Sequence, residues 1–242
     1  MRTRRDAFGL AAVVLCAAMA SAAGCNRGQE QTAPADQGQV PNADTSLADT
    51  GRKHFVIAFL GDSLTSGYGL VAQQAFPTLI ENMFHAEGYG DVEVLNGGMT
   101  GDTTAGGLRR VEQLLNPNVR ILVIGLGGND ALRGLTVKQT HDNLAAIIDG
   151  VNRSGVGVVL AGMEAPTNYG QDYQDAFRAT FGQLAQEHRN VTFVPFLLEG
   201  VGGHPELNQA DGIHPNADGA RIIAEHLYPK LRTMVDSLGG GG

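Results

Sequence analysis

Short apolar runs alternate with amphipathic segments five times between residues 54 and 235, and this alternation constrains the fold more than any other feature of the chain. The run at 120–125 reads RILVIG, a continuous apolar stretch that is typical of a strand buried in a parallel sheet. The other predicted strands are 54–60, 92–95, 156–160 and 191–196. Helical spacing of apolar residues predicts helices at 75–87, 103–115, 137–151, 172–188 and 216–235. This order predicts an α/β fold with a parallel sheet that is covered by helices on both faces.

Three chemically useful residues fall at one end of this predicted sheet. Ser63, Gly101 and Asn129 each follow a predicted strand. In open parallel sheets, ligands bind outside the carboxyl ends of the strands. We therefore expect a functional site at this edge.

The first 53 residues differ in composition from the rest of the chain. Three arginines precede an apolar run at 8–20 that is too short to span a membrane comfortably, and small residues follow, so residues 1–24 are predicted to be a signal peptide. Residues 22–25 read AAGC, which resembles a bacterial lipoprotein signal, and Cys25 is the expected site of lipidation. An ordinary signal peptide, cleaved near the same place, is the alternative.

Residues 25–53 are predicted to be a flexible polar linker, because they hold too few large apolar side chains to offset the entropy of ordering. The remaining segment, 54–238, is predicted to be one domain. It contains no cysteine, which excludes a disulfide, a thiol nucleophile and a cysteine metal site there. The net charge of −8 argues against a nucleic-acid partner.

Ser63 lies in the sequence FLGDSLTSGYG. A serine directly after a strand is more often a helix cap or a turn residue than a nucleophile. The sequence also departs from the nucleophile-elbow pattern G-x-S-x-G, because Thr65 stands at the place of the second glycine. Ser63 alone therefore does not indicate catalysis.

Asp211 precedes His214 by three residues in the sequence DGIHPN. A histidine base needs a carboxylate that orients its ring and stabilises its charge, and an aspartate in the same loop can provide this. The alternative is that Asp211 caps a turn and His214 is a surface residue. The order Ser, Asp, His along the chain occurs in hydrolases built on α/β sheets.

Two glycine clusters, 96–102 and 125–130, could cradle phosphates, but neither fits G-x-G-x-x-G or a P-loop. Such loops can instead direct hydrogen-bond donors at a developing oxyanion. Gly101 offers an unobstructed backbone N–H, and Asn129 offers a side-chain amide.

Four motifs, GDSL at 61–64, TGDT at 100–103, GGND at 127–130 and DGIHPN at 211–216, resemble the SGNH (GDSL) hydrolase family. The resemblance spans about residues 54–235 and is greatest to the bacterial periplasmic thioesterase, lysophospholipase and arylesterase group. It implies a flavodoxin-like, three-layer α/β/α fold with a five-stranded parallel sheet.

The resemblance also implies roles for five residues. Ser63 would be the nucleophile, His214 the base and then the acid, and Asp211 the residue that orients His214. The oxyanion hole would consist of the Ser63 N–H, the Gly101 N–H and the Asn129 side chain. No metal or other cofactor is implied.

The expected reaction is hydrolysis of a small-molecule acyl ester: a short-to-medium acyl ester, a thioester or a lysophospholipid. A deacetylase of envelope or plant carbohydrates is the alternative, and a non-catalytic envelope binding protein is a more remote one. Seven side chains near the motifs are candidates for an acyl groove: Leu64, Tyr68, Leu70, Leu132, Leu135, Met163 and Tyr169. The expected location is the bacterial cell envelope, with attachment to the membrane through Cys25. The sequence does not determine the oligomeric state.

Overall fold

The computed structural model describes residues 54–240. Residues 1–53, which include the predicted signal peptide, the predicted linker and Cys25, lie outside the described residues. None of the helices that the structure describes is both long and apolar enough to cross a membrane.

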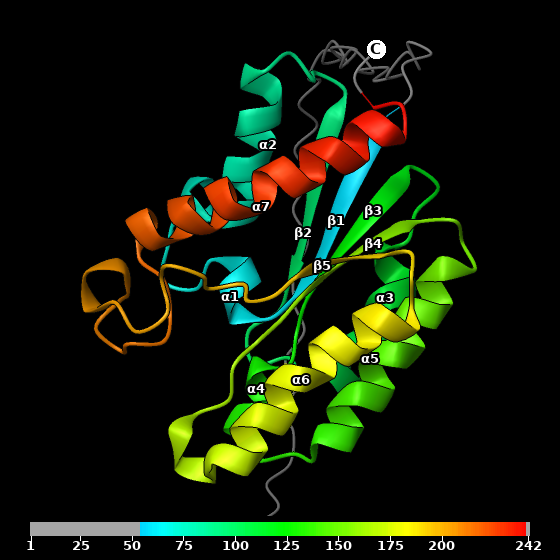
Figure 1. The fold of residues 1–242 in the computed structure, drawn as a ribbon. Coiled ribbons are helices and arrows are strands. Elements are labelled where there is room, and N and C mark those ends of the chain that lie inside the picture. The colour runs from blue at the N-terminus through cyan, green and yellow to red at the C-terminus, as the bar shows by residue number, and fades with distance from the viewer. Residues whose placement is uncertain (1–53, 241–242) are drawn as a thin grey trace, which may run out of the picture. The chain divides into compact units, whose positions relative to one another are not determined.

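Five parallel strands form one sheet in the order β2–β1–β3–β4–β5 (Figure 1). Their bounds are β1 (Phe55–Gly61), β2 (Val92–Gly98), β3 (Val119–Gly125), β4 (Gly157–Ala161) and β5 (Val191–Val194). All seven residues of β1 are buried, as expected for a central strand. This strand order is the flavodoxin-like one, in which the topological switch point lies between β1 and β3. The residues that follow these two strands are therefore the ones most favourably placed to form a site.

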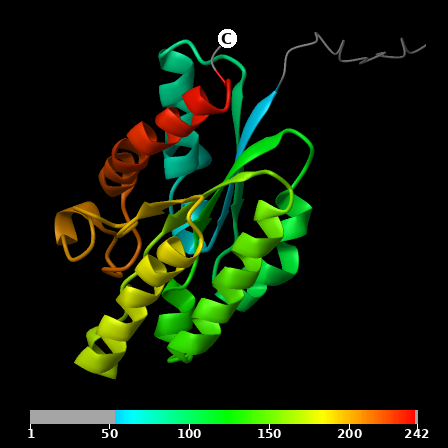
Figure 2. The ribbon, with the colours of Figure 1, turned by 45° about the vertical axis from the view of Figure 1, so that its right-hand side comes forward.

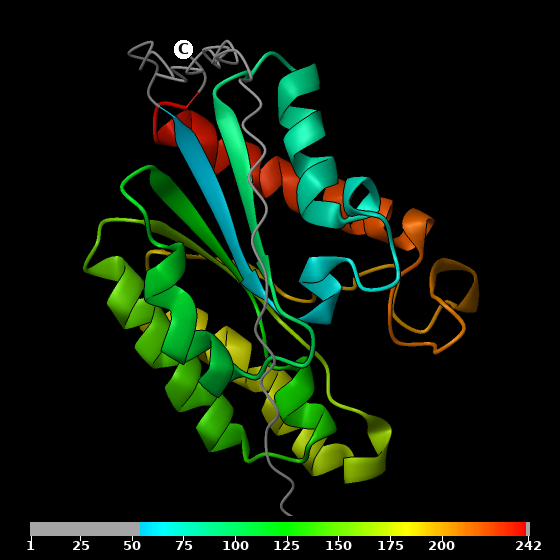
Figure 3. The same cartoon turned by 180° about the vertical axis from the view of Figure 1, so that it is seen from behind.

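Two layers of helices cover the sheet, and they are seen on opposite faces in three views (Figures 1, 2 and 3). On one face lie α2 (Phe76–Ala86) and α7 (Ala217–Ser237). On the other lie α3 (Thr104–Leu114), α5 (Val137–Asn152) and α6 (Gln171–Glu187). The connections contain α1 (Ser63–Ser66), α4 (Gly128–Leu132) and the 3₁₀ turns η1 (Ala72–Gln74), η2 (Thr167–Tyr169) and η3 (Pro205–Leu207). The predicted α/β/α fold with a five-stranded parallel sheet is confirmed.

Two strand ends differ from the prediction by more than one residue. β2 continues three residues beyond the predicted end at 95, and Gly97 and Gly98 pair with the end of β1. Glycine suits this part of the strand because a side chain does not fit: a Cβ at Gly97 would lie 2.6 Å from the Phe59 carbonyl oxygen. β5 ends at Val194 rather than at 196, because Pro195 has no N–H to donate to a neighbouring strand.

Candidate active site

Ser63 is the first residue of the short helix α1, directly beyond the end of β1. Asp62 caps this helix, and its carboxylate accepts a hydrogen bond from the Leu64 N–H at 3.0 Å. The helix ends after one turn at Gly67, whose φ of 72° suits glycine. Capping at both ends holds the Ser63 hydroxyl at the carboxyl edge of the sheet, where the side chain is 9% exposed.

The structure brings Ser63, His214 and Asp211 together, although 151 residues separate the first two. The distance from Ser63 Oγ to His214 Nε2 is 2.8 Å. On the other side of the imidazole, His214 Nδ1 lies 2.7 Å from Asp211 Oδ2. A serine hydroxyl, an imidazole and a carboxylate thus form a continuous chain of short polar contacts.

Asp211 organises its own loop as well as the His214 ring. Its Oδ1 accepts hydrogen bonds from the Ile213 N–H at 2.9 Å and the His214 N–H at 3.0 Å. Gly212 makes this turn possible by adopting a φ of 69°. The hydrogen bonds from the His214 backbone and ring, followed by that from Ile213, lower the pKa of Asp211 to about 2. The carboxylate is therefore charged at neutral pH and can stabilise an imidazolium.

Neighbouring side chains hold this loop against the rest of the site. Gln209 donates from Nε2 to the Tyr68 carbonyl at 2.7 Å and to the Pro215 carbonyl at 2.9 Å. The Tyr68 ring lies over the His214 ring, with 4.6 Å between the centroids. These contacts link the loop that bears His214 to the segment that follows α1.

Asn129 and Gly101 line the same cleft as Ser63. Asn129 lies in α4, and its Nδ2 donates to Asp62 Oδ2 at 3.0 Å, which uses one of its two hydrogens and orients the amide. Within residues 54–240, neither the Ser63 N–H nor the Gly101 N–H donates to another protein group. The first helical residue has no intrahelical acceptor, so the free Ser63 N–H follows from its position. Three donors thus remain available in the cleft.

Asp62 is an additional residue of the site that sequence reasoning missed as such. It is 2% exposed, directly precedes Ser63 in the chain, and accepts a hydrogen bond from the Asn129 amide. Burial raises the pKa of Asp62 to about 6, although the hydrogen bonds from Leu64 and Asn129 act in the opposite direction. Burial of this carboxylate is unfavourable, and the hydrogen bonds from the Leu64 N–H and the Asn129 amide offset part of that cost. The sequence shows an aspartate next to Ser63 and singles out Asn129, but it does not show that these two side chains are hydrogen-bonded.

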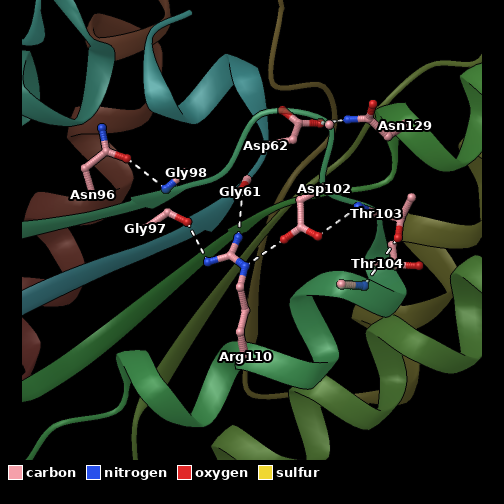
Figure 4. A network of polar contacts seen from close by, with 12 residues as sticks. Gly61, Asp62, Asn96, Gly97, Gly98, Asp102, Thr103, Thr104, Arg110 and Asn129 are labelled. Carbon is pink, nitrogen blue, oxygen red and sulfur yellow. Dashed lines mark hydrogen bonds and ion pairs between the residues drawn. The ribbon is translucent and has the colours of Figure 1, made fainter. Parts of the chain in front are cut away.

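A second group of polar residues supports the loop that carries Gly101. Arg110 forms an ion pair with Asp102 and also donates to two backbone carbonyls (Figure 4). Asp130, fully buried, accepts hydrogen bonds from the Thr104 N–H and hydroxyl. No local sequence pattern singled out these contacts, which join residues that are 8 to 49 positions apart along the chain.

A cleft of about 950 Å³ opens beside Ser63. Four of the seven apolar candidates line it: Leu64, Tyr68, Leu132 and Met163. Leu70 instead lines a small neighbouring pocket, whereas Leu135 and Tyr169 line neither. The Tyr169 hydroxyl donates to the Leu132 carbonyl at 3.0 Å, so this tyrosine contacts the backbone of a residue that lines the cleft. Phe196 and Leu198 also line the cleft and were not among the candidates.

Among the residues that the structure describes, no group of three or more His, Cys, Asp or Glu side chains is placed to hold a metal ion. The polar groups that line the cleft include the Ser63 hydroxyl, the His214 imidazole, the carboxylates of Asp62 and Asp211, and the Asn129 amide.

Comparisons with known proteins agree with this geometry. Residues 59–222 match the model of the GDSL-like lipase/acylhydrolase family. The chain is 39% identical to esterase TesA of Pseudomonas aeruginosa over 177 residues, which are 73% of this chain and 87% of that protein. It is 36% identical to thioesterase 1/protease 1/lysophospholipase L1 of Escherichia coli over 181 residues, 74% of this chain and 85% of that protein.

The fold leads to the same group of proteins. The crystal structure of TesA superimposes with a TM-score of 0.70 and 38% sequence identity, covering 74% of this chain and 99% of that one. The family match begins within β1, ahead of Ser63, and ends beyond His214. The chain is therefore a member of the GDSL-like lipase/acylhydrolase family.

Proposed function

We propose that this protein is a serine esterase that hydrolyses acyl esters through an acyl-enzyme on Ser63. The observation that carries the proposal is the series of contacts from Ser63 Oγ through His214 to Asp211, at 2.8 Å and 2.7 Å. A hydroxyl within reach of an oriented base is the arrangement that activates serine as a nucleophile. Family membership supports the same reaction, as do the relatives named esterase, thioesterase and lysophospholipase.

In the first half of the reaction, Ser63 Oγ attacks the carbonyl carbon of the ester and His214 Nε2 takes the hydroxyl proton. The imidazolium is stabilised by Asp211, which holds the ring through Nδ1. When the tetrahedral intermediate collapses, the bond to the leaving group breaks and His214 returns the proton to the departing oxygen, or sulfur in a thioester. The acyl group remains on Ser63.

The oxyanion of the intermediate accepts hydrogen bonds from the Ser63 N–H, the Gly101 N–H and the Asn129 amide. Fixed donors of this kind stabilise the transition state because they require no reorganisation as charge develops. In the second half of the reaction, water gives a proton to His214 and attacks the acyl carbon. When this second tetrahedral intermediate collapses, the bond between the acyl carbon and Ser63 Oγ breaks, and His214 returns the proton to Oγ. The acid leaves, and the Ser63 hydroxyl is restored.

The cleft favours acyl chains over small acetyl groups. Its volume of about 950 Å³ exceeds what an acetyl group needs, and its walls carry Leu64, Leu132 and Met163. Apolar walls with a few polar groups suit ligands with an apolar chain and one reactive carbonyl. We therefore propose short-to-medium acyl esters, thioesters or lysophospholipids as substrates, in preference to acetylated carbohydrates.

Hydrolysis of p-nitrophenyl esters from acetate to palmitate tests this function. Activity should peak between butyrate and decanoate, and Ser63→Ala should lower kcat by roughly 10⁴-fold or more. Ser154→Ala changes an exposed serine outside the site and should behave as wild type. Activity confined to acetate would favour a deacetylase. Full activity of purified Ser63→Ala protein would contradict the proposal, and no activity on any ester would favour a binding protein.

The proposed location is the bacterial cell envelope, with export directed by residues 1–24 and attachment through a lipid on Cys25. The support is the sequence pattern before Cys25, together with the bacterial origin of the relatives. Expression of the full chain in bacteria with a clickable fatty acid should label the wild type and not Cys25→Ser. Equal labelling, or none in either protein, would contradict the anchor and leave the esterase proposal untouched.

A further inference from the structure

Arg110 is a largely buried cation outside the group of residues that would contact the substrate. It lies in α3, and its side chain is 13% exposed. Its Nε donates to Asp102 Oδ2 at 2.7 Å. Nη1 donates to the Gly97 carbonyl at 2.7 Å, and Nη2 donates to the Gly61 carbonyl at 2.9 Å. All three nitrogens of the guanidinium are thus engaged, each with a different residue (Figure 4).

The three acceptors belong to segments that lead directly into the cleft. Gly61 ends β1 and is separated from Ser63 by Asp62 alone. Asp102 directly follows Gly101. Gly97 lies near the end of β2, from which the chain continues to Gly101. The two backbone N–H groups proposed as oxyanion donors are therefore carried by two segments that one guanidinium ties together.

Close packing around this group leaves little freedom for the two segments. A Cβ at Gly106 would collide with the Asp102 carboxylate, so only glycine lets this carboxylate lie against the start of α3. A Cβ at Gly98 would collide with the Ser66 N–H, where β2 passes α1. The Met99 N–H also donates to the Gly61 carbonyl at 3.0 Å. The Gly61 carbonyl therefore accepts hydrogen bonds from both Met99 and Arg110.

Arginine suits this place because its planar fork donates in several fixed directions, whereas a lysine ammonium is a single point donor. Asp102 balances the charge, with 9% of its side chain exposed, and also accepts from the Thr103 N–H at 3.1 Å. We infer that Arg110 is a positioning residue that sets the separation of the Ser63 and Gly101 N–H groups, and so the fit of the oxyanion. This inference rests on the proposed function.

The test compares Arg110→Lys with wild type, using p-nitrophenyl butyrate and a butylboronic acid inhibitor. A boronate forms a tetrahedral adduct on serine and uses the same donors as the intermediate. Active sites are counted with a fluorophosphonate, so that kcat refers to folded, reactive protein. We expect kcat to fall roughly 10- to 100-fold, because misplacement by about 1 Å can cost 10²-fold. KM should change little, and the boronate Ki should rise in proportion to the fall in kcat.

Arg109→Lys is the matched control, because Arg109 is the exposed neighbour on the same helix. It should leave kcat, Ki and the melting temperature near their wild-type values. Asp102→Asn is the second variant. It keeps the shape of the side chain but removes the charge that Arg110 pairs with, and it should show a smaller change in the same direction. If the Arg110→Lys protein does not fold, kcat and the boronate Ki are measured on Asp102→Asn instead.

Three results would overturn the inference. The first is a lower melting temperature with kcat per active site within twofold of wild type, since Arg110 would then serve stability alone. The second is a lower kcat with an unchanged boronate Ki, since the oxyanion donors would then be intact. The third is an equal loss in Arg109→Lys. If Ser63→Ala kept full activity, the proposed function would fail first, and that result is independent of Arg110.

Discussion

Two carboxylates lie beside the Ser63–His214 pair, and their surroundings are opposite. Asp62 is 2% exposed, and burial raises its pKa to about 6. The Asp211 side chain is 39% exposed, and hydrogen bonds from His214 and Ile213 lower its pKa to about 2. One half of the site is therefore built from buried strand ends, and the other half is an exposed loop.

The comparison indicates that the two halves of the site have different roles. The buried half comprises Asp62 and Ser63, which are buried, together with Gly101, Arg110 and Asn129, which are partly buried. In the proposed mechanism, this half holds the nucleophile and the oxyanion donors. The loop half, residues 208–215, would carry the base and its carboxylate near solvent, where proton exchange with water is easy. Stabilisation of the transition state by fixed dipoles depends on rigidity, and the buried half provides it.

The largest effect is expected from His214→Ala in the loop half. Without the base, kcat should fall by roughly 10⁴-fold or more, as in other enzymes that lose one member of a serine–histidine pair. Combining it with Ser63→Ala should add little, because the two residues act as a unit. Steady-state kinetics with p-nitrophenyl butyrate measures both. A loss below about 10²-fold would show that another group serves as the base.

Asn129→Ala tests the buried half and should have the next largest effect. Loss of one oxyanion donor lowers kcat by roughly 10²- to 10³-fold. KM should change little, since the oxyanion forms only in the transition state. Asn190→Ala, at an exposed position on the far side of the domain, is the control. A change in KM alone would assign Asn129 to substrate binding instead.

Asp62→Asn tests whether the two carboxylates, Asp62 and Asp211, have pKa values shifted in opposite directions. The pKa of Asp62 rises from 3.8 in the unfolded chain to about 6 in the folded one, so the folded chain holds the proton more tightly. Between these values the unfolded chain binds fewer protons, and the free energy of unfolding falls as the pH rises. From pH 4 to pH 7, the wild type should lose about 2 kcal/mol that Asp62→Asn does not lose.

Asp211→Asn is the matched variant in this experiment, and urea unfolding at both pH values is the measurement. The pKa of Asp211 is lowered from 3.8 to about 2, so its stabilising effect is present above pH 3.8 and is lost as the pH falls through about 2. Between pH 4 and pH 7 this variant should therefore follow the wild-type slope. If Asp62→Asn also followed it, the buried carboxylate would not be the source of the pH dependence.

Gly212→Ala should have the smallest effect. The φ of 69° at Gly212 disfavours a side chain, but no atom lies within 4 Å of the position of the added Cβ. The cost is therefore one of backbone conformation, about 1 kcal/mol in unfolding free energy. Gly106→Ala in the buried half should cost more, because its Cβ meets the Asp102 carboxylate. If urea unfolding gave equal losses of unfolding free energy for Gly212→Ala and Gly106→Ala, the proposed difference in rigidity between the two halves would be contradicted.

Sequence reasoning succeeded where the information is local. Apolar periodicity predicted the order of strands and helices, and four short motifs predicted family membership, both of which are confirmed. The same motifs named Ser63, Gly101, Asn129, Asp211 and His214, and the structure places all five along one cleft.

Sequence reasoning failed where a contact joins distant segments. The pairing of Asp62 with Asn129 spans 67 residues, and the contact of Arg110 with the Gly61 carbonyl spans 49. No periodicity or spacing encodes such contacts. The lining of the cleft was predicted only in part for the same reason: packing against other elements decides which side of a loop faces the cleft, as the hydrogen bond from Tyr169 to Leu132 illustrates.

The most direct test of the account is covalent labelling with ethyl p-nitrophenyl phosphonate, followed by mass spectrometry of the intact protein and its peptides. A phosphonate ester reacts with an activated serine and releases nitrophenolate. The account predicts one monoethyl phosphonate group per chain, located on Ser63, with labelling abolished in Ser63→Ala and greatly slowed in His214→Ala. Stoichiometric labelling of another residue, or of the Ser63→Ala protein, would contradict it.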